Sequence, residues 1–230
     1  MSNTSRFDPG LWAVVPIKNF AHAKERLASI LTAPERQSLF TAMLEDVLQT
    51  LSQCAALTGI VLVTREREAQ ALGKRYGARS LIEPANLGHT AASTLGARSL
   101  AANKGTSMLQ LPADVPLIKP DDINVLILAH GNGPAITLAP SRDHRGSNAV
   151  LCTPPDLLPL QFGDDSFKPH LAASRALNIE PTVVERPGLA LDIDTPEDLV
   201  ALLEKSSATR AYNYLRSSGI DKRLIDQRDS

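Results

Sequence analysis

Apolar residues occur in this chain both as short unbroken runs and as longer stretches with helical spacing. The run Leu11–Ile17 predicts a buried strand, whereas apolar positions between Pro34 and Cys54 recur at three- and four-residue steps, as in a helix. The same reading gives strands at 59–64, 80–82, 106–111, 135–138 and 148–152, and helices at 66–76, 90–103, 121–130 and 167–178. Alternating strands and helices predict an α/β fold, a mostly parallel sheet with helices on both faces.

One main domain is expected between residues 11 and 205, after an N-terminal tail, 1–10, and before a C-terminal extension, 206–230. Residues 140–187 mix loops with a strand and a helix, and we interpret them as an insertion over the functional rim of the sheet. The extension has a helical pattern around Tyr212–Arg216. Its polar end, 217–230, is expected to be disordered or to dock on a partner subunit in a homodimer.

The stretch Leu191–Leu199 carries the most distinctive polar pattern. A strand here would place Asp192 and Asp194 on one face, and Thr195 could cap a following helix with Asp198 three residues later. Two adjacent carboxylates repel each other unless a cation lies between them, and oxygen ligands suit Mg²⁺. The alternative is that both aspartates belong to a helix cap and face water.

A third carboxylate supports the metal site. Asp114 follows the apolar run 106–111, just past the carboxyl end of a buried strand, where open α/β sheets bind their ligands. In a parallel sheet Asp114 would meet Asp192 and Asp194 at a common rim. Three carboxylates gathered there would require cations.

Three basic residues, Lys18, Lys24 and Arg26, follow the first strand and could neutralise a polyphosphate. This loop lacks the glycine spacing of a Walker or Rossmann loop, and alone it would also suit a solvated surface. Beside a carboxylate-rich metal site, it favours phosphoryl or nucleotidyl transfer.

Composition narrows the function classes. The 230 residues carry a net charge of −1 and are 43% hydrophobic, which is typical of a globular protein and argues against nucleic acid as the main partner. There is no apolar run of membrane-spanning length and no secretory signal pattern, so we expect a cytoplasmic protein. Cys54 and Cys152 are too few for a disulfide scaffold or zinc site.

Between about Leu11 and Leu203 the chain resembles the 2-phospho-L-lactate guanylyltransferase family. The resemblance rests on five segments in matching order and spacing: Pro16–Leu27, Leu111–Pro116, Gly146–Ala149, Phe162–Phe167 with His170, and Leu191–Pro196. It implies a nucleotidyltransferase fold with a glycosyltransferase-A-type, Rossmann-like sheet. It also implies transfer of GMP from GTP to a small phosphorylated carboxylic acid, with release of pyrophosphate, in coenzyme F(420) biosynthesis.

The resemblance also implies roles for individual residues. Asp114, Asp192 and Asp194 match Mg²⁺ ligands; Lys18, Lys24 and Arg26 match contacts to the nucleotide phosphates, with Lys18 among the catalytic groups; Ser147, Gly163 and Ser166 match positions that hold the phospho-acid; and His170 matches a family histidine. Ser147 stands where members usually have threonine, which keeps the hydroxyl but loses a methyl group.

The guanine is expected along residues 83–92, which include Glu83 and Gly88. Members commonly have an asparagine where this chain has Thr90. Glu83 could still accept hydrogen bonds from the N1–H and the exocyclic amine of guanine, a pair of donors that adenine does not present.

Several alternatives stay open at this point. The acceptor is 2-phospho-L-lactate, phosphoenolpyruvate or 3-phospho-D-glycerate. A molybdenum-cofactor or sugar-phosphate nucleotidyltransferase would be expected to carry a Gly-Gly pair after the first strand, which residues 16–27 lack. A non-catalytic nucleotide-binding or partner-binding module would keep the fold without turnover.

Overall fold

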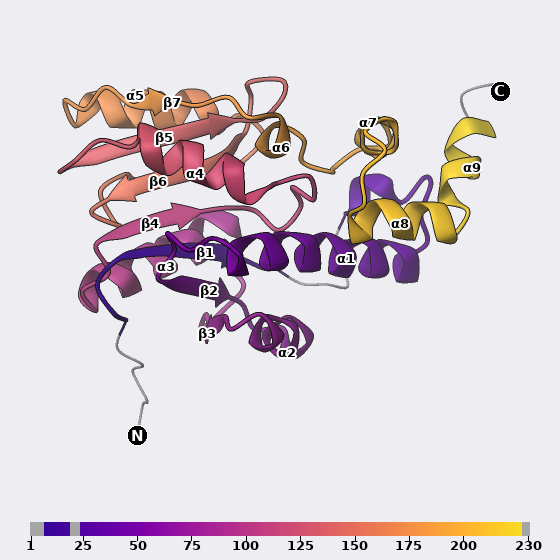
Figure 1. The fold of residues 1–230 in the computed structure, drawn as a ribbon, viewed down its shortest axis with the longest axis horizontal. Coiled ribbons are helices and arrows are strands. Elements are labelled where there is room, and N and C mark those ends of the chain that lie inside the picture. Colours follow the sequence, from indigo (N-terminus) through magenta and orange to yellow (C-terminus); the bar gives the residue numbers. More distant parts are fainter. Residues whose placement is uncertain (1–6, 19–23, 227–230) are drawn as a thin grey trace.

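A seven-stranded sheet forms the centre of the computed structural model, which describes residues 7–18 and 24–226 (Figure 1). Its order is β3-β2-β1-β4-β6-β5-β7. The strands are β1 (Leu11–Pro16), β2 (Gly59–Val63), β3 (Arg79–Leu81), β4 (Ser107–Gln110), β5 (Ala135–Pro140), β6 (Ser147–Thr153) and β7 (Thr182–Val183). Every pairing is parallel except the two that β6 makes with β4 and β5, so the mostly parallel sheet is confirmed.

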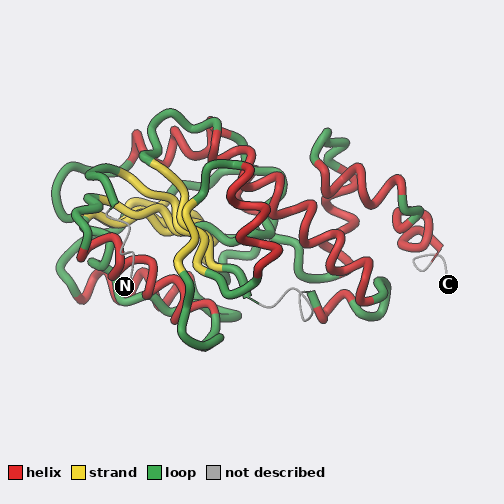
Figure 2. Tube along the Cα trace, turned by 90° about the horizontal axis from the view of Figure 1, so that it is seen from below, coloured by secondary structure: helices red, strands yellow, loops and turns green. Residues whose placement is uncertain are grey.

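Helices cover both faces of this sheet, as Figure 2 shows edge-on. Their bounds are α1 (Ala33–Ser52), α2 (Arg67–Arg75), α3 (His89–Ala102), α4 (Pro120–Ala129), α5 (Phe167–Ala176), α6 (Pro187–Ala190), α7 (Pro196–Glu204), α8 (Arg210–Ser217) and α9 (Ile220–Asp226), with a 3₁₀ turn, η2, at Glu25–Leu27. The core on one face joins α1, α2, α4 and α6–α9, and the cores on the other face contain α3 and α5. None of these described helices combines the length and apolar character needed to cross a bilayer.

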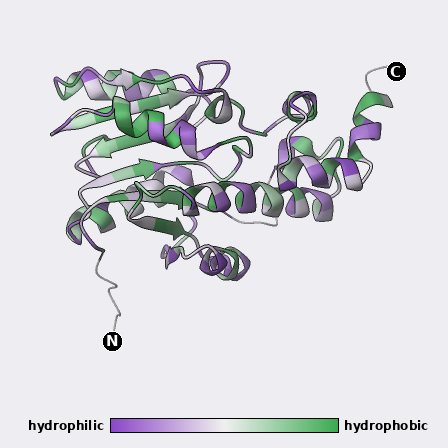
Figure 3. Cartoon of the chain, viewed as in Figure 1, coloured by the Kyte–Doolittle hydropathy of each residue, from purple (hydrophilic) through white to green (hydrophobic). Residues whose placement is uncertain are grey.

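Side-chain alternation along β1 shows how one strand serves two cores. Ala13 and Val15 pack into the core beneath α1, while Trp12 and Val14 pack beneath α3. A strand with apolar residues at successive positions can therefore be buried on both faces, which is the pattern that predicted it. In Figure 3 the strands are mainly green, whereas the helices carry both purple and green residues.

The segment 191–194 differs from expectation, because it is not part of any strand. It runs extended beside the end of β4, where the Ile193 N–H donates to the Asp114 carbonyl at 3.0 Å. Leu191 and Ile193 are still buried in the core, so Asp192 and Asp194 still point away from it. The helix behind them is α7, and Asp198 accepts hydrogen bonds from the Thr195 N–H and hydroxyl as the capping pattern predicts.

The reversed direction of β6 decides what lies at the edge of the sheet that binds ligands. Because β6 is antiparallel to β4, its amino end with Ser147 lies at the same edge as the carboxyl ends of β1 and β4. Residues 140–187 thus supply a central strand as well as loops at the rim.

The C-terminal residues pack on their own chain. Leu215 of α8 and Ile220 of α9 are fully buried in the core shared with α1, and Asp46 of α1 accepts hydrogen bonds from the N–H groups of Arg210 and Ala211. The expected disorder of residues 217–230 is therefore wrong for α9, whereas docking on a partner subunit stays a prediction. Residues 227–230 lie outside the described residues. Ile220 and Leu224 give α9 the apolar stripe that holds it.

Candidate active site

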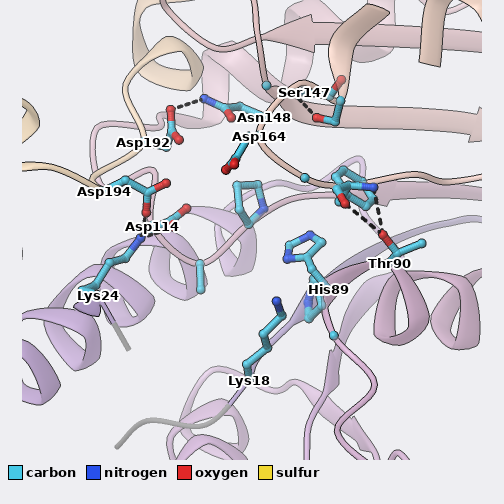
Figure 4. Close-up of a pocket in the computed structure, with 18 of the residues that line it drawn as sticks. Lys18, Lys24, His89, Thr90, Asp114, Ser147, Asn148, Asp164, Asp192 and Asp194 are labelled. Atoms are coloured by element: carbon cyan, nitrogen blue, oxygen red, sulfur yellow. Dashed lines mark hydrogen bonds and ion pairs between the residues drawn. The ribbon is translucent and has the colours of Figure 1, made fainter. Parts of the chain in front are cut away.

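A cavity of about 720 Å³ opens at the edge of the sheet where β1 and β4 end and β6 begins (Figure 4). Segments far apart in the sequence line it: the chain after β1, the start of α3, the loop after β4, the start of β6, and the residues before α5 and α7. Ten of the residues singled out from the sequence are on its wall: Lys18, Lys24, Arg26, Gly88, Asp114, Ser147, Gly163, Ser166, Asp192 and Asp194.

The three aspartates come together on one side of the cavity. Lys24 Nζ donates to Asp194 Oδ1 at 2.7 Å and also to Asp114, so its ammonium group bridges these two carboxylates. Asp192 accepts a hydrogen bond from the Asn148 amide at 3.0 Å. Asn148, to which we assigned no role from the sequence, is itself held by donating to the Leu189 carbonyl.

The charges in this cluster are not balanced. Burial and the neighbouring Asp114 raise the pKa of Asp192 to about 6. Burial also disfavours ionisation of Asp194, but Lys24 and Arg26 outweigh it and lower the pKa of Asp194. Asp114 Oδ1 is buried, and none of the described residues offers it a hydrogen bond. Lys24 therefore pairs with two of the three carboxylates, and no cation among the described residues pairs with Asp192.

This cluster has the chemistry of a site for a hard cation. Its donors are carboxylate oxygens, and the unpartnered Asp114 Oδ1 and the crowded Asp192 would both gain from a divalent ion. Within 7–18 and 24–226, however, no three His, Cys, Asp or Glu side chains are grouped closely enough to hold a metal. Lys24 takes the space between Asp114 and Asp194 instead.

The three cations expected to bind one polyphosphate are spread around the cavity. Lys24 faces the aspartates, and Arg26 pairs with Asp164 at 2.8 Å where both side chains are exposed. Lys18 lies on another wall, where its Nζ approaches Gly88. Residues 19–23 of this loop lie outside the described residues.

The start of α3 offers an anion-binding surface. Gly88, directly before the helix, has φ +96°, a left-handed conformation that favours glycine, and α3 then runs for 14 residues. The first N–H groups of a helix have no partners within it and attract anions. His89 is half-buried beside them, with its Nε2 2.9 Å from the Gln110 amide nitrogen, and desolvation together with Lys18 lowers the pKa of His89 to about 3.

The opposite wall carries hydroxyl groups. The Ser147 N–H donates to Ser166 Oγ at 2.9 Å, and Ser147 Oγ lies 2.9 Å from Nδ1 of the fully buried His170. Gly163 also lines the cavity, and a side chain added there would meet open space. Such a wall suits an anion or a polar group that only accepts hydrogen bonds.

Thr90 fastens the loop that carries Gly163. Its hydroxyl donates to the Phe162 carbonyl at 3.2 Å, and the Phe162 N–H donates back to Thr90 Oγ1 at 2.9 Å. The Phe162 ring also contacts His89 edge-on. Thr90, which stands where asparagine was expected, therefore joins α3 to the wall that carries the hydroxyl groups.

Glu83 is the one predicted site residue that does not line the main cavity. It is buried beside a smaller cavity of about 190 Å³, which it shares with Lys18 and Arg65. Burial raises the pKa of Glu83, although Arg65 and Lys18 oppose the effect. Lys18 borders both cavities, so Glu83 adjoins the side of the main cavity that Lys18 and Gly88 form.

The fold is shared with solved nucleotidyltransferase structures. A protein from Desulfovibrio desulfuricans G20, named as a nucleotide-diphospho-sugar transferase, superposes with a TM-score of 0.76 at 16% identity, covering 94% of this chain and 97% of the other. A nucleotidyl transferase from Methanothermobacter superposes with a TM-score of 0.62 at 18% identity, covering 90% of this chain and 99% of the other. The fold is therefore that of the glycosyltransferase-A-like nucleotidyltransferases.

The sequence comparisons define the family within this class. Residues 11–229 match the profile of the guanylyl transferase CofC-like family, and the chain belongs to that family. The phosphoenolpyruvate guanylyltransferase of Rubrobacter xylanophilus is 36% identical, covering 84% of this chain and 93% of its own. The 3-phospho-D-glycerate guanylyltransferase of Colwellia psychrerythraea is 33% identical, covering 88% of this chain and 96% of its own. The 2-phospho-L-lactate guanylyltransferase of Methanobrevibacter ruminantium is 28% identical, covering 91% of this chain and 92% of its own.

Proposed function

We propose that this protein transfers GMP from GTP to a three-carbon phospho-acid and releases pyrophosphate, as a step in coenzyme F(420) biosynthesis. The observation that carries the proposal is a single cavity with a carboxylate cluster, a helix N-terminus with cations, and a hydroxyl wall. Two anionic substrates need separate binding surfaces of this kind, because each must be held against the repulsion of the other.

GTP is assigned to the side formed by α3. The N–H groups after Gly88, together with Lys18, would hold its phosphates, and Arg26 at the mouth would meet the departing pyrophosphate. The base would extend toward the small cavity at Glu83. Ser147, Gly163 and Ser166 are left for the phospho-acid on the opposite wall.

Mg²⁺ is the cation that we propose for the carboxylate cluster, held by Asp114, Asp192 and Asp194. When bound, it would polarise the α-phosphate and draw the two anions together. Lys24 would give up at least one of its two aspartates and become available to a phosphate oxygen. The unpartnered Asp114 Oδ1 supports this assignment.

The reaction itself requires no protein base. The second pKa of a phosphomonoester is about 6, so the acceptor phosphate is largely dianionic at neutral pH. One of its oxygens forms a bond to the α-phosphorus of GTP, the bond to the β-bridging oxygen breaks, and pyrophosphate leaves with the electron pair. The side chains position both reactants and offset the charge on the leaving group.

The test is pyrophosphate release from GTP and Mg²⁺ with each of the three acids in turn. Phosphoenolpyruvate is tried first, since relatives named for it reach 36% and 37% identity. Omission of the acid provides the blank, and the product should carry GMP on the acid's phosphate. Absence of turnover with all three acids would refute the proposal.

Base selection is tested separately at Glu83. A carboxylate suits the two adjacent donors of guanine and repels the acceptor that adenine presents. We expect GTP to be used in strong preference to ATP, and Glu83→Gln to narrow that preference by weakening use of GTP. Equal rates with ATP in the unmodified protein would rule out guanine selectivity.

A further inference from the structure

A chain of hydrogen bonds behind the hydroxyl wall fixes where its protons lie. The backbone N–H of Gln161 donates to His170 Nε2 at 3.0 Å, and His170 Nδ1 lies 2.9 Å from Ser147 Oγ. Both ring nitrogens are therefore engaged. Turning the ring over would place carbon atoms against both partners, so the ring orientation is determined as well.

Only one protonation state satisfies both contacts. A backbone N–H can only donate, so Nε2 must carry a lone pair and no proton. A neutral imidazole then has its proton on Nδ1, which donates it to Ser147 Oγ. A cation would turn Nε2–H against the Gln161 N–H, and burial lowers the pKa of His170 to about 4, so the ring is neutral at pH 7.

These hydrogen bonds determine where the hydroxyl protons of Ser147 and Ser166 can point at the cavity. Ser147 Oγ accepts from His170, so its own proton has to be donated elsewhere. Ser166 Oγ likewise accepts from the Ser147 N–H. In the described structure neither hydroxyl donates to another protein group, and both residues line the cavity.

We propose that His170 is a positioning residue that, together with the Ser147 N–H, sets two hydroxyl protons to bind the carboxylate of the phospho-acid. This inference rests on the proposed function and names the subsite within it. A carboxylate has acceptors only, which matches two fixed neutral donors. The phosphate end, with its higher charge, would face the cations and Mg²⁺ on the aspartate side.

Two substitutions at the same position separate this role from simple support of the loop. In His170→Gln the amide oxygen can still accept from the Gln161 N–H at the position of Nε2, but the donor to Ser147 is lost. In His170→Asn the amide nitrogen can still donate to Ser147 at the position of Nδ1, but the acceptor for Gln161 is lost. Each variant keeps one of the two hydrogen bonds.

We expect His170→Gln to raise the KM for the phospho-acid about tenfold, with kcat and the KM for GTP nearly unchanged. His170→Asn should raise the acceptor KM much less than His170→Gln does. In a Ser147→Ala background, His170→Gln should have little further effect, because the hydroxyl it orients is gone. The reverse order of the two single variants would overturn the proposal and assign His170 to loop support.

A second measurement does not depend on turnover. The ¹⁵N chemical shifts of the His170 ring in the intact protein at pH 7 should report a proton on Nδ1 and none on Nε2, and the signals should move when phosphoenolpyruvate is added. A ring protonated on Nε2 would refute the inference even if the enzyme is active. Nδ1 protonation with no turnover of any acid would instead refute the proposed function alone.

Discussion

At the scale of single residues, the site holds carboxylates close enough to repel one another. Asp192 is half-buried next to Asp114, accepts a hydrogen bond from the uncharged amide of Asn148, and has a pKa raised to about 6. A carboxyl group whose charged form is disfavoured in the folded protein lowers the stability of the fold at neutral pH, where it is ionised. A cation bound between Asp192, Asp114 and Asp194, as proposed above, would offset this cost.

Asp192→Asn provides a direct test of this account. The substitution keeps the shape and removes a charge, so we expect turnover to fall by at least about a hundredfold, roughly 3 kcal/mol in the barrier. Thermal unfolding should occur at the same or a higher temperature, because a repulsion has been removed. Asp121→Asn, at an exposed carboxylate of α4, is the matched control. Near-normal Mg²⁺-dependent activity in Asp192→Asn would remove this residue from the metal site.

His170 also makes stability depend on pH. Its pKa is about 4 in the folded protein and about 6.5 in an unfolded chain. Above pH 6.5 neither state binds the proton. Between pH 6.5 and 4 only the unfolded state does, so the free energy of unfolding should fall as the pH is lowered, by up to about 3 kcal/mol.

Urea unfolding at pH 7, 6 and 5 measures this dependence. His89, whose pKa is lowered to about 3, adds to it in the same direction, whereas Asp192, whose pKa is raised to about 6, opposes it, so the contribution of His170 is isolated by comparing variants. Replacing His170 by asparagine should make the loss of stability between pH 6.5 and 5 less steep. An unchanged slope would show that His170 is protonated equally well in both states.

At the scale of elements, the hydroxyl wall, formed by Ser147, Gly163 and Ser166, depends on contacts between α3, α5 and the loop that joins β6 to α5. Thr90 of α3 holds Phe162 by two hydrogen bonds, and His170 of α5 holds Gln161. The Phe167 N–H ties the start of α5 to the Arg145 carbonyl at 2.8 Å. Gly163 and Ser166 are thus fixed from both sides of the loop.

Thr90→Val should loosen this loop. The valine keeps the shape but leaves the Phe162 N–H without its acceptor, so we expect a loss of about 1–2 kcal/mol in unfolding free energy and a higher KM for the phospho-acid. Thr90→Ser keeps the hydroxyl and is the control. If valine and serine behave alike in both measurements, the hydroxyl does not hold the loop.

At the scale of the whole molecule, the C-terminal helices complete the core of one face of the sheet. α8 packs along α1, which also packs against the strands, so burial at Leu215 is linked to the central sheet (Figure 1). The buried carboxylate of Asp46 depends on N–H donors from the start of α8. These helices are therefore part of the main folding unit.

Leu215→Ala should cost about 2–5 kcal/mol of unfolding free energy, because it opens a cavity at a fully buried position. Asn213→Ala, on the exposed side of α8, should have little effect. Urea unfolding followed by circular dichroism compares the two. Equal midpoints would show that α8 is not coupled to the core.

The sequence by itself determined the order and kind of most elements and the family of the chain. Apolar spacing and helix caps act over a few residues, so β1, α1 and the start of α7 can be predicted from local patterns. The position of a residue after a strand also indicates which edge of the sheet it reaches. For that reason Asp114, Asp192 and Asp194 were expected together, and they line one cavity.

Only the tertiary structure decided the direction of β6, the docking of α9, and the partners of the charged groups. Lys24 contacts Asp194 across 170 positions of sequence, and no local pattern states which carboxylate a lysine will meet. Glu83, two residues after β3, lies at a neighbouring cavity beside Arg65, which comes from a different part of the chain. Strand direction and ion pairing depend on the packing of distant segments, whereas hydrophobic periodicity is written into neighbouring residues.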